Sequence, residues 1–461
     1  MKTILIPIAN SFFVRNFLRT DAFRILMENH NLRMIFLAPS DKLEYYRSEF
    51  PFKNVFFEKL PELNNLILER IFKFLENSSI HTNTVTMLQR WQFWRVSEQV
   101  SLAKRFFFFV FGRLCWHLGR FRWWRILIRK AYLLLSSGIF SAFFDRWRPD
   151  LVFAPNMIYP EDHILLREAK QRGLKTLGMG LSWDNFYSKS LIRVFPDQLM
   201  IHTDTIANQA VTYCDFPAGL ITVTGIPQYD DYFLKKRIVS REEFIRSIGG
   251  DPAKKLIVYA FSGKAGLHLD FGIVRIVYDL ISSGKIKEKA DVLLRPYPRL
   301  DFPEKKLEAV RKNFGFLAVC PLRHIGDSKN SWEFDEKSLD LLANTLAHAD
   351  LVITMYSTFF IEAAIFDKPL IGVAFDGRDQ LDYWDSARRF FDWDHLAELK
   401  KFNGVWLVHS EDELAEAINK YLDNPQYMAE GRQRIVKKQA QFTDGRSGER
   451  VARTISKILG V

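Results

Sequence analysis

The stretch DLVITMYSTFFIEAAIFDKPLIGVAFD, residues 350–376, decides the fold class. It begins with a short apolar run at 351–355, of the kind that forms a buried strand. Ser357 and Thr358 start a helix-like segment, and a second apolar run follows a Lys-Pro break at 370–373. Strand, helix and strand in this order are the unit from which parallel sheets are built. We therefore expect an α/β protein.

The start of this helix also suits a ligand that carries phosphate. Backbone N–H groups at a helix N-terminus lack helical partners, and the helix dipole is positive there. Glu362 follows one turn later, where a carboxylate can accept hydrogen bonds from ribose hydroxyl groups. An ordinary crossover unit with a capped helix explains the same residues, so this motif alone leaves both interpretations open.

Three further segments carry motifs of a similar kind. They read ITVTGIPQYD at 221–230, DVLLRPYPR at 291–299 and TDGRSGER at 443–450. Together with the first stretch, their order and spacing resemble those of GT-B glycosyltransferases, CDP-glycerol glycerophosphotransferases and UDP-N-acetylglucosamine 2-epimerases. The resemblance covers roughly residues 150–461. It departs from the R-P-H-P segment at Tyr297, which stands where that pattern has His, so the role of that His does not carry over.

The resemblance implies that the C-terminal domain binds a nucleotide-linked donor. Ser357 and Thr358 would then hold its phosphates, and Glu362 would hold the ribose. Arg295 ends a predicted strand, and its guanidinium group can bind a diphosphate through two nitrogens.

A small loop after the first strand of this domain is a further candidate for donor binding. It consists of Ser262, Gly263 and Lys264. Glycine lets the backbone approach a phosphate closely, and lysine adds positive charge. A simple connection between strand and helix is the alternative.

The acceptor would bind in the N-terminal domain. Residues 180–189 read GLSWDNFYSK directly after a predicted strand, and a Trp-Asp-Asn cluster is unusual for a mere connection. We predict that Asp184 is the general base that removes the proton of the acceptor hydroxyl group. Trp183 and Asn185 are predicted to contact the acceptor. A helix cap or a loop-orienting role is the alternative for Asp184.

Two other groups are candidates on the acceptor side. Glu161, Asp162 and His163 start a predicted helix that follows a strand, and we include them as candidate catalytic residues. Acidic residues in a first helical turn are also favoured by the helix dipole alone. Asn10 and Arg15 lie near the end of the first predicted strand, where they would contact the acceptor or the donor.

The bulk composition is that of a globular protein with more than one domain. A chain of 461 residues is long enough to form two or three domains with substantial cores. Its hydrophobic content of 48% and charged content of 26% are typical of globular proteins. The three cysteines are widely spaced, which indicates neither a disulfide framework nor a zinc site and suits a reducing cytoplasm. No D-x-D motif stands in a suitable place, so we expect a metal-independent enzyme without a cofactor besides its nucleotide-sugar co-substrate.

A basic and aromatic segment at about 104–144 stands out in a chain of net charge +11. No acidic residue occurs between Glu98 and Asp145. Cations interleaved with Trp and Phe favour the headgroup region of an anionic membrane, with core packing and single-stranded nucleic acid as alternatives. We expect a membrane surface and no nucleic acid, because no nucleic-acid-binding module is recognisable. The basic residues are Lys104, Arg105, Arg113, Arg120, Arg122, Arg125, Arg129 and Lys130.

The expected architecture is two doubly wound Rossmann-like domains that face a cleft, as in GT-B proteins. The acceptor domain spans 1–235 and carries a helical insertion at about 60–148, and 236–252 reads as a linker. The donor domain spans 253–430, and helices at 431–461 would pack back towards the first domain.

The function expected from these features is that of a membrane-associated glycosyltransferase. It would move a sugar from a nucleotide-sugar donor to a surface-glycan or lipid-linked acceptor at the inner face of a bacterial cell membrane. Three alternatives stay open: a CDP-glycerol-type polyol phosphotransferase, a sugar-nucleotide 2-epimerase, and a non-catalytic binding module of the same fold.

Overall fold

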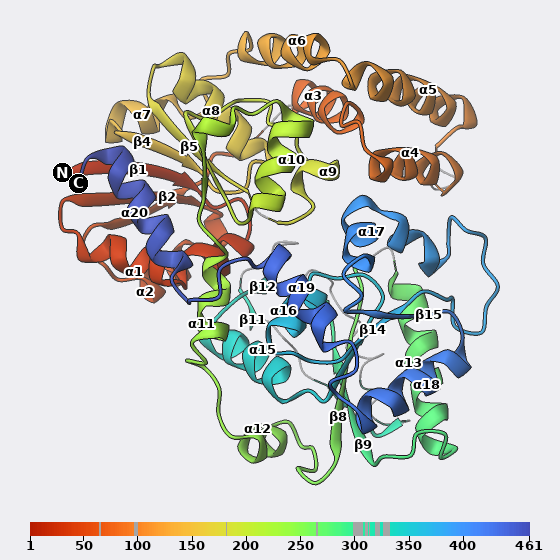
Figure 1. Ribbon diagram of the computed structural model, residues 1–461. Helices are drawn as coiled ribbons and strands as arrows, with labels where there is room; N and C mark the ends of the chain where they lie inside the picture. Colours follow the sequence, from red (N-terminus) through yellow and green to blue (C-terminus); the bar gives the residue numbers. More distant parts are fainter. Residues whose placement is uncertain are drawn as a thin grey trace. The chain divides into compact units, whose positions relative to one another are not determined.

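The chain has two compact α/β units, each with its own parallel sheet (Figure 1). The first contains Met1–Asp230 and Gln441–Val461, and the second contains most of Asp231–Ala440. This confirms the expected fold class of two Rossmann-like domains. The computed structural model describes residues 1–63, 66–95, 100–180, 182–263, 266–297, 308, 312, 314–318, 323–325 and 332–461.

The first unit is built on a seven-stranded parallel sheet of order β3-β2-β1-β4-β5-β6-β7. Side chains alternate between its two faces. Ile4 and Ile6 of β1 therefore join the core on one face, and Leu5 joins the core on the other. The strands are β1 (Lys2–Pro7), β2 (Leu32–Ala38), β3 (Val55–Lys59), β4 (Leu151–Ala154), β5 (Lys175–Met179), β6 (Gln198–Ile201) and β7 (Ile221–Val223).

Helices cover both faces of this sheet. The C-terminal helix α20 packs on α1, and Gly448 is required there because a Cβ atom would lie 2.7 Å from the backbone nitrogen of Ala22. Asp230 anchors the start of α20 by accepting hydrogen bonds from the N–H groups of Ser447 (3.0 Å) and Gly448 (2.7 Å). The helices are α1 (Asp21–Glu28), α2 (Leu43–Glu49), α8 (Pro160–Gln171), α9 (Asn185–Ser188), α10 (Asp204–Cys214) and α20 (Ser447–Leu459), with the short helix η1 (Val14–Leu18).

Between β3 and β4, the described residues form five helices, in the region of the expected insertion. Helix α5 contacts α3, α4 and α6. Gly119, at the end of α5, allows close contact, because a Cβ atom there would lie 1.9 Å from the carbonyl oxygen of Ser79. The helices are α3 (Ile67–Ser78), α4 (Asn83–Arg95), α5 (Leu102–Gly119), α6 (Arg122–Leu133) and α7 (Ser141–Trp147).

Buried ion pairs attach α3 to the rest of the first unit. Glu69 and Glu76 lie two turns apart on α3, so they face the same side. The fully buried Arg193 pairs with both carboxylates, at 3.1 Å to Glu69 and 2.9 Å to Glu76. Glu69 also pairs with Arg167 of α8 (3.2 Å) and accepts a hydrogen bond from the hydroxyl group of Tyr132 on α6 (2.7 Å). These contacts link α3 to α6, to α8 and to the loop after α9.

Two basic residues of the insertion face the protein interior. Arg125 donates two hydrogen bonds to Asp215, at 2.7 and 2.6 Å, and Arg129 donates to the backbone carbonyls of Ile192 (3.1 Å) and Leu191 (2.9 Å). The expectation that these two side chains contribute to a membrane-facing surface is therefore wrong. Their partners lie more than sixty positions away in sequence and are brought close only by the fold.

The second unit is built on a six-stranded parallel sheet of order β10-β9-β8-β13-β14-β15. Strands β11 and β12 lie between β10 and β13 in sequence and form a separate antiparallel pair. The strands are β8 (Lys255–Ala260), β9 (Ala290–Arg295), β10 (Leu317–Ala318), β11 (Arg323–His324), β12 (Trp332–Glu333), β13 (Leu351–Thr354), β14 (Leu370–Val373) and β15 (Trp406–Val408).

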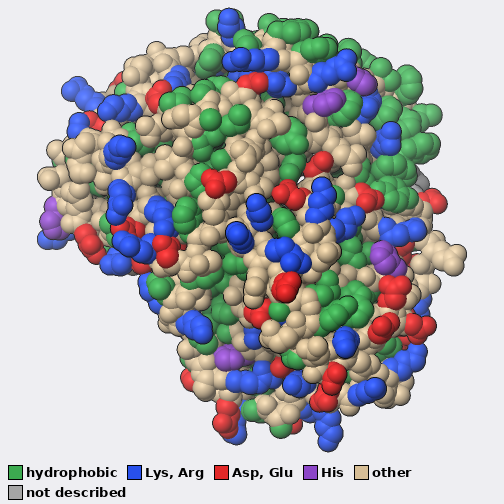
Figure 2. Space-filling model, viewed as in Figure 1, with side chains coloured by type: hydrophobic (Ala, Val, Ile, Leu, Met, Phe, Trp, Pro, Cys, Tyr) green, Lys and Arg blue, Asp and Glu red, His purple; other side chains and the backbone are tan. Residues whose placement is uncertain are grey.

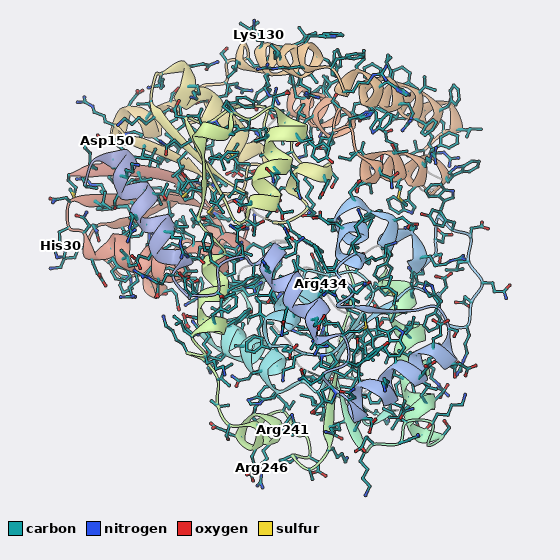
Figure 3. The ribbon with its side chains drawn as sticks, viewed as in Figure 1. His30, Lys130, Asp150, Arg241, Arg246 and Arg434 are labelled. Carbon is teal, nitrogen blue, oxygen red and sulfur yellow. The ribbon has the colours of Figure 1, made fainter. Side chains whose placement is uncertain are left out.

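The segment expected to be a linker, 236–252, is part of the second unit and contains helix α12. Phe244 and Ile245 are buried, and Arg241, labelled in Figure 3, pairs with Asp350 at 2.7 Å. The helices at 431–461, expected to pack back towards the first domain, are divided between the two units. Helix α19 belongs to the second unit and α20 to the first. The helices are α11 (Asp230–Phe233), α12 (Arg241–Ser247), α13 (Leu267–Ser282), α15 (Glu336–His348), α16 (Phe359–Ile365), α17 (Asp394–Lys400), α18 (Glu411–Asp423) and α19 (Ala429–Gln439).

The ion pairs of α3 predict a large effect of one substitution. Arg193→Met would leave two buried carboxylates without their shared cation, and we expect the free energy of unfolding to fall by about 3–5 kcal/mol. Urea denaturation followed by tryptophan fluorescence measures this. Lys59→Met, which removes an exposed pair with Glu62, is the matched control and should change stability little. An equally small change for Arg193→Met would contradict this account.

Candidate functional site

The candidate donor residues converge at one edge of the second sheet. Strands β9, β8 and β13 are neighbours and parallel, so their carboxyl ends lie side by side. Arg295, Ser262 and Ser357 follow or end these strands. Ligands of open parallel sheets bind at this edge. Lys264 lies outside the described residues.

A buried carboxylate organises the loop between β8 and α13. Asp270 accepts hydrogen bonds from the backbone N–H (3.0 Å) and hydroxyl group (2.6 Å) of Ser262, and from the hydroxyl group of Tyr259 (2.9 Å). Burial raises the pKa of Asp270 to about 7, although these three donors favour its ionised form. The Ser262 hydroxyl is thus engaged inside the loop. Gly266 fits because a Cβ atom there would lie 2.4 Å from that hydroxyl oxygen, and Gly263 lies in the same loop.

Arg295 lies beside the start of α16. Its side chain is 7% exposed, and its guanidinium carbon is 5.1 Å from the centre of the Phe359 ring. Phe359 is the first residue of α16 and directly follows Ser357 and Thr358. The structure therefore brings the predicted site residues Arg295, Ser357 and Thr358 together. The hydroxyl oxygen of Ser357 accepts a hydrogen bond from the Phe359 N–H (3.1 Å), and Thr358 is exposed.

Glu362 connects α16 to α11 within the second unit. Its side chain is 4% exposed and accepts a hydrogen bond from the hydroxyl group of Tyr232 (2.8 Å). The Tyr232 ring in turn contacts Phe366, with ring centres 5.2 Å apart. The structure therefore gives Glu362 a position one turn into α16 and a structural partner. Its predicted contact with a ribose stays a prediction.

An aromatic group at the same edge was missed by sequence reasoning. Tyr356, two residues after β13, stacks on Phe390 with ring centres 3.9 Å apart, and Trp393 contacts Phe390 edge-on at 5.2 Å. Burial raises the pKa of Tyr356. The cluster of aromatic residues in FFDWDH, 390–395, was the available signal. Such rings can stack with a nucleotide base.

On the first sheet, the loop after β5 is held by its own polar residues. Asp184 pairs with Lys189 at 2.5 Å. Asn185 is buried, accepts a hydrogen bond from the Ser182 N–H (3.1 Å) and donates one to the carbonyl of Asn156 (3.3 Å). Trp183 is buried in the same loop. These contacts order the loop, and its predicted roles in acceptor binding and proton removal stay predictions.

The other predicted residues of the first unit lie near strand ends, but two of them are enclosed. Glu161, Asp162 and His163 form the first turn of α8 after β4. Asp162 and His163 have no exposed surface; burial raises the pKa of Asp162 and lowers that of His163. His163 lies 3.9 Å from Glu76, at the ion pairs of α3. A direct contact between either side chain and an acceptor would need a change of conformation.

Asn10 and Arg15 follow β1. Asn10 is buried and accepts a hydrogen bond from the Phe12 N–H (2.8 Å), which shapes the turn out of the strand. Arg15 lies in η1 and is partly exposed. Within the described ranges, no group of three or more His, Cys, Asp or Glu side chains is placed to hold a metal ion.

Comparison with known sequences gives matches to transferases of cell-wall polymers. Residues 328–457 match the family of CDP-Glycerol:Poly(glycerophosphate) glycerophosphotransferases. The teichoic acid ribitol-phosphate polymerases TarL and TarK of Staphylococcus aureus strain NCTC 8325 are each 26% identical over 242 residues, or 51% of this chain. The aligned region covers 37% of TarL and 40% of TarK, so the chain matches well under half of the length of these curated relatives.

Comparison with solved structures gives GT-B proteins. A UDP-N-acetylglucosamine 2-epimerase matches with a TM-score of 0.54 and 14% identity over 100% of this chain and 96% of its own. The S. aureus MnaA structure with UDP matches with a TM-score of 0.54 and 13% identity, over 100% of this chain and 97% of its own. The Neisseria meningitidis 2-epimerase bound to UDP-GlcNAc matches with a TM-score of 0.53 and 12% identity, over 99% of this chain and 100% of its own.

At identities of 12–14%, the likeness to solved structures shows the fold alone. The sequence matches add a similarity to the glycerophosphotransferases and the ribitol-phosphate polymerases. Both agree with the motifs at 221–230, 291–299, 350–376 and 443–450. The chain therefore has the fold of the GT-B proteins, and its residues 328–457 are similar in sequence to the CDP-glycerol glycerophosphotransferases.

Proposed function

We propose that the chain transfers a polyol phosphate from a CDP-linked polyol to a hydroxyl group of a cell-surface polymer. The main support for this activity is the family match at 328–457, because the matched segment includes β13 and α16 with Ser357, Thr358 and Glu362. The two ribitol-phosphate polymerases support the same chemistry. The proposal adopts the phosphotransferase alternative in place of the nucleotide-sugar transfer first expected.

The proposed reaction is a displacement at phosphorus. The acceptor oxygen forms a bond to the β-phosphorus, the bond from that phosphorus to the bridging oxygen breaks, and CMP leaves. The acceptor proton passes to a base, for which Asp184 is the candidate. Negative charge grows on the leaving phosphate, and a buried cation in the right position stabilises it. Arg295, beside the start of α16, is the residue that we assign to this role.

Transfer of a sugar from a nucleotide sugar is the second candidate function. Tyr297 favours it, because this residue stands where the phosphotransferase pattern has His. In that reaction the acceptor oxygen attacks the anomeric carbon, and a nucleoside diphosphate leaves. The released nucleotide therefore separates the two reactions: a nucleoside monophosphate for polyol-phosphate transfer and a diphosphate for sugar transfer.

The identity of the released nucleotide tests the proposal. We expect CMP from CDP-ribitol or CDP-glycerol with a polyol-phosphate oligomer as acceptor, and no UDP from UDP-N-acetylglucosamine. Arg295→Ala should lower kcat/KM by about ten- to a hundredfold, because charged hydrogen bonds to the leaving group are lost. Arg275→Ala, on the exposed side of α13, is the matched control. Release of a nucleoside diphosphate would support the second candidate, and no release from any donor would favour a binding module.

We also propose that the insertion holds the protein at an anionic membrane surface. Helix α6 exposes Trp123, Ile126 and Leu127 along one stripe, and α5 exposes Phe107 and Leu114. Trp123 is 56% exposed and Phe107 62%. Figure 2 shows hydrophobic side chains gathered over α5, with Lys and Arg among them near α6. Such a surface suits the interface between headgroups and acyl chains.

Exposed cations of α6 and the preceding turn support the same proposal. Arg120, Arg122 and Lys130 are exposed, and Lys130 points away from the helices in Figure 3. In the described part of the chain, no helix is long and apolar enough to cross a bilayer. The exposed aromatic residues and cations are the basis for proposing attachment to the surface of the membrane, at its inner face, where a lipid-linked acceptor would be met.

Charge reversal tests the membrane proposal. The variant Arg120→Glu, Arg122→Glu, Lys130→Glu should bind vesicles of phosphatidylglycerol and phosphatidylcholine at least about a hundredfold more weakly, since each basic residue near such a surface contributes about 1 kcal/mol. The control variant is Lys287→Glu, Lys289→Glu, Lys437→Glu. It has the same net charge, and its three changes are at exposed positions of the second unit. Equal loss of vesicle sedimentation in both variants would mean that net charge alone, and not this surface, governs binding.

A further inference from the structure

The helical insertion contains a cavity that none of the predicted site residues lines. It lies between α3, α4 and α5 and has a volume of about 560 Å³. Cavities of this size hold small organic ligands. One wall includes Pro160, the first residue of α8, which follows the carboxyl end of β4. The cavity thus reaches the edge of the first sheet where the acceptor candidates lie.

Aromatic rings form the apolar wall of the cavity. Phe74 of α3 packs against Phe108 of α5, with ring centres 5.5 Å apart, and Phe93 of α4 packs against Phe109 of α5 at 5.0 Å. These pairs come from three helices, so the rings are held by packing around the cavity. A hydrocarbon chain among them would be removed from water, which is the main favourable term in binding apolar ligands.

The charged residues that line the cavity have an excess of positive charge. Glu69 is neutralised by its ion pairs with Arg167 and Arg193, described above. Arg70, Lys104 and Arg105 also line the cavity, and among the described residues none of the three has an ion-pair partner. An anion of the ligand would complete this arrangement. Phosphate fits it well, because arginine binds phosphate oxygens in pairs.

Buried polar atoms in the wall also lack partners. Three atoms are buried and make no hydrogen bond with the residues that the structure describes: Arg105 Nε, Asn77 Oδ1 and Gln89 Oε1. Such atoms are rare in folded proteins, because a buried polar group without a partner costs free energy. A phosphate oxygen of a ligand can accept a hydrogen bond from the Arg105 Nε–H group.

We propose that this cavity binds one anionic lipid. Its isoprenoid or acyl chain would lie among the phenylalanine rings, and its phosphate would contact Arg70, Lys104 and Arg105. The exposed apolar face of α5 and α6, next to the cavity in sequence and fold, provides the route of entry from a membrane. The inference concerns binding alone and does not depend on the transferase activity proposed above.

Calorimetric titration of the whole chain with a soluble analogue tests this inference. The probe is farnesyl phosphate below its micelle concentration, with farnesol and inorganic phosphate as partial ligands. We expect one site per chain for farnesyl phosphate, affinity at least about tenfold lower for farnesol, and no measurable binding of phosphate alone. Equal affinity for farnesol, or no binding of farnesyl phosphate, would overturn the proposal.

Two variants locate the site in the cavity. Arg70→Ala with Lys104→Ala should weaken binding of farnesyl phosphate by at least about tenfold. Gln92→Trp fills the cavity from an exposed position on α4 and should abolish binding without affecting folding. Lys287→Ala with Lys289→Ala removes the same charge from exposed positions of the second unit and should leave the affinity unchanged. Loss of binding in this control, or none in the first two variants, would overturn the assignment.

The source of the lipid is resolved by a second probe. Dioctanoyl phosphatidic acid carries the same phosphate on two acyl chains. Preference for farnesyl phosphate would support the isoprenoid carrier of an acceptor as the natural ligand, and preference for the diacyl probe would support a membrane phospholipid. Because no donor nucleotide is present, failure of these titrations leaves the transferase proposal intact, and failure of CMP release leaves the lipid site intact.

Discussion

Arg193 is the side chain on which the arrangement of the first unit depends. It is fully buried and pairs with two carboxylates that lie two turns apart on α3. Removing three charged groups from water is costly, and only their mutual pairing and hydrogen bonds compensate for it. Since α3 also forms walls of the cavity and contacts α5 and α6, the same ion pairs determine where the apolar face and the basic residues stand.

In the second unit, the corresponding constraint is the parallel sheet itself. Its strands all end at one edge, which gathers residues from β8, β9 and β13 that are far apart in sequence. Asp270 then shapes the loop after β8 from within, through bonds to Ser262 and Tyr259. In the order of the sheet, Ser262 after β8 therefore lies between Arg295 of β9 and the start of α16 after β13.

The sequence predicted those parts of the fold that local patterns encode. The apolar runs at 351–355 and 370–373 became β13 and β14, and the expected α/β class with two Rossmann-like domains is confirmed. What it missed depends on distant partners. Arg125 and Arg129 read as surface cations because Asp215 lies in another part of the sequence. The segment 236–252 read as a linker because its charges outnumber Phe244 and Ile245, the residues that pack it.

The candidate site was foreseen only in outline. Strand-end residues such as Arg295 and Ser357 could be predicted because parallel strands share one edge. The burial of His163, the Tyr232 partner of Glu362 and the stacking of Tyr356 on Phe390 could not, because each depends on tertiary packing.

A crystal structure of the chain with CDP would show directly whether the second unit binds the donor. We expect the diphosphate within hydrogen-bonding distance of the Arg295 guanidinium group and beside Ser357 and Thr358, at the carboxyl edge of the second sheet. A nucleotide bound away from this edge, or an empty edge at saturating CDP, would contradict it.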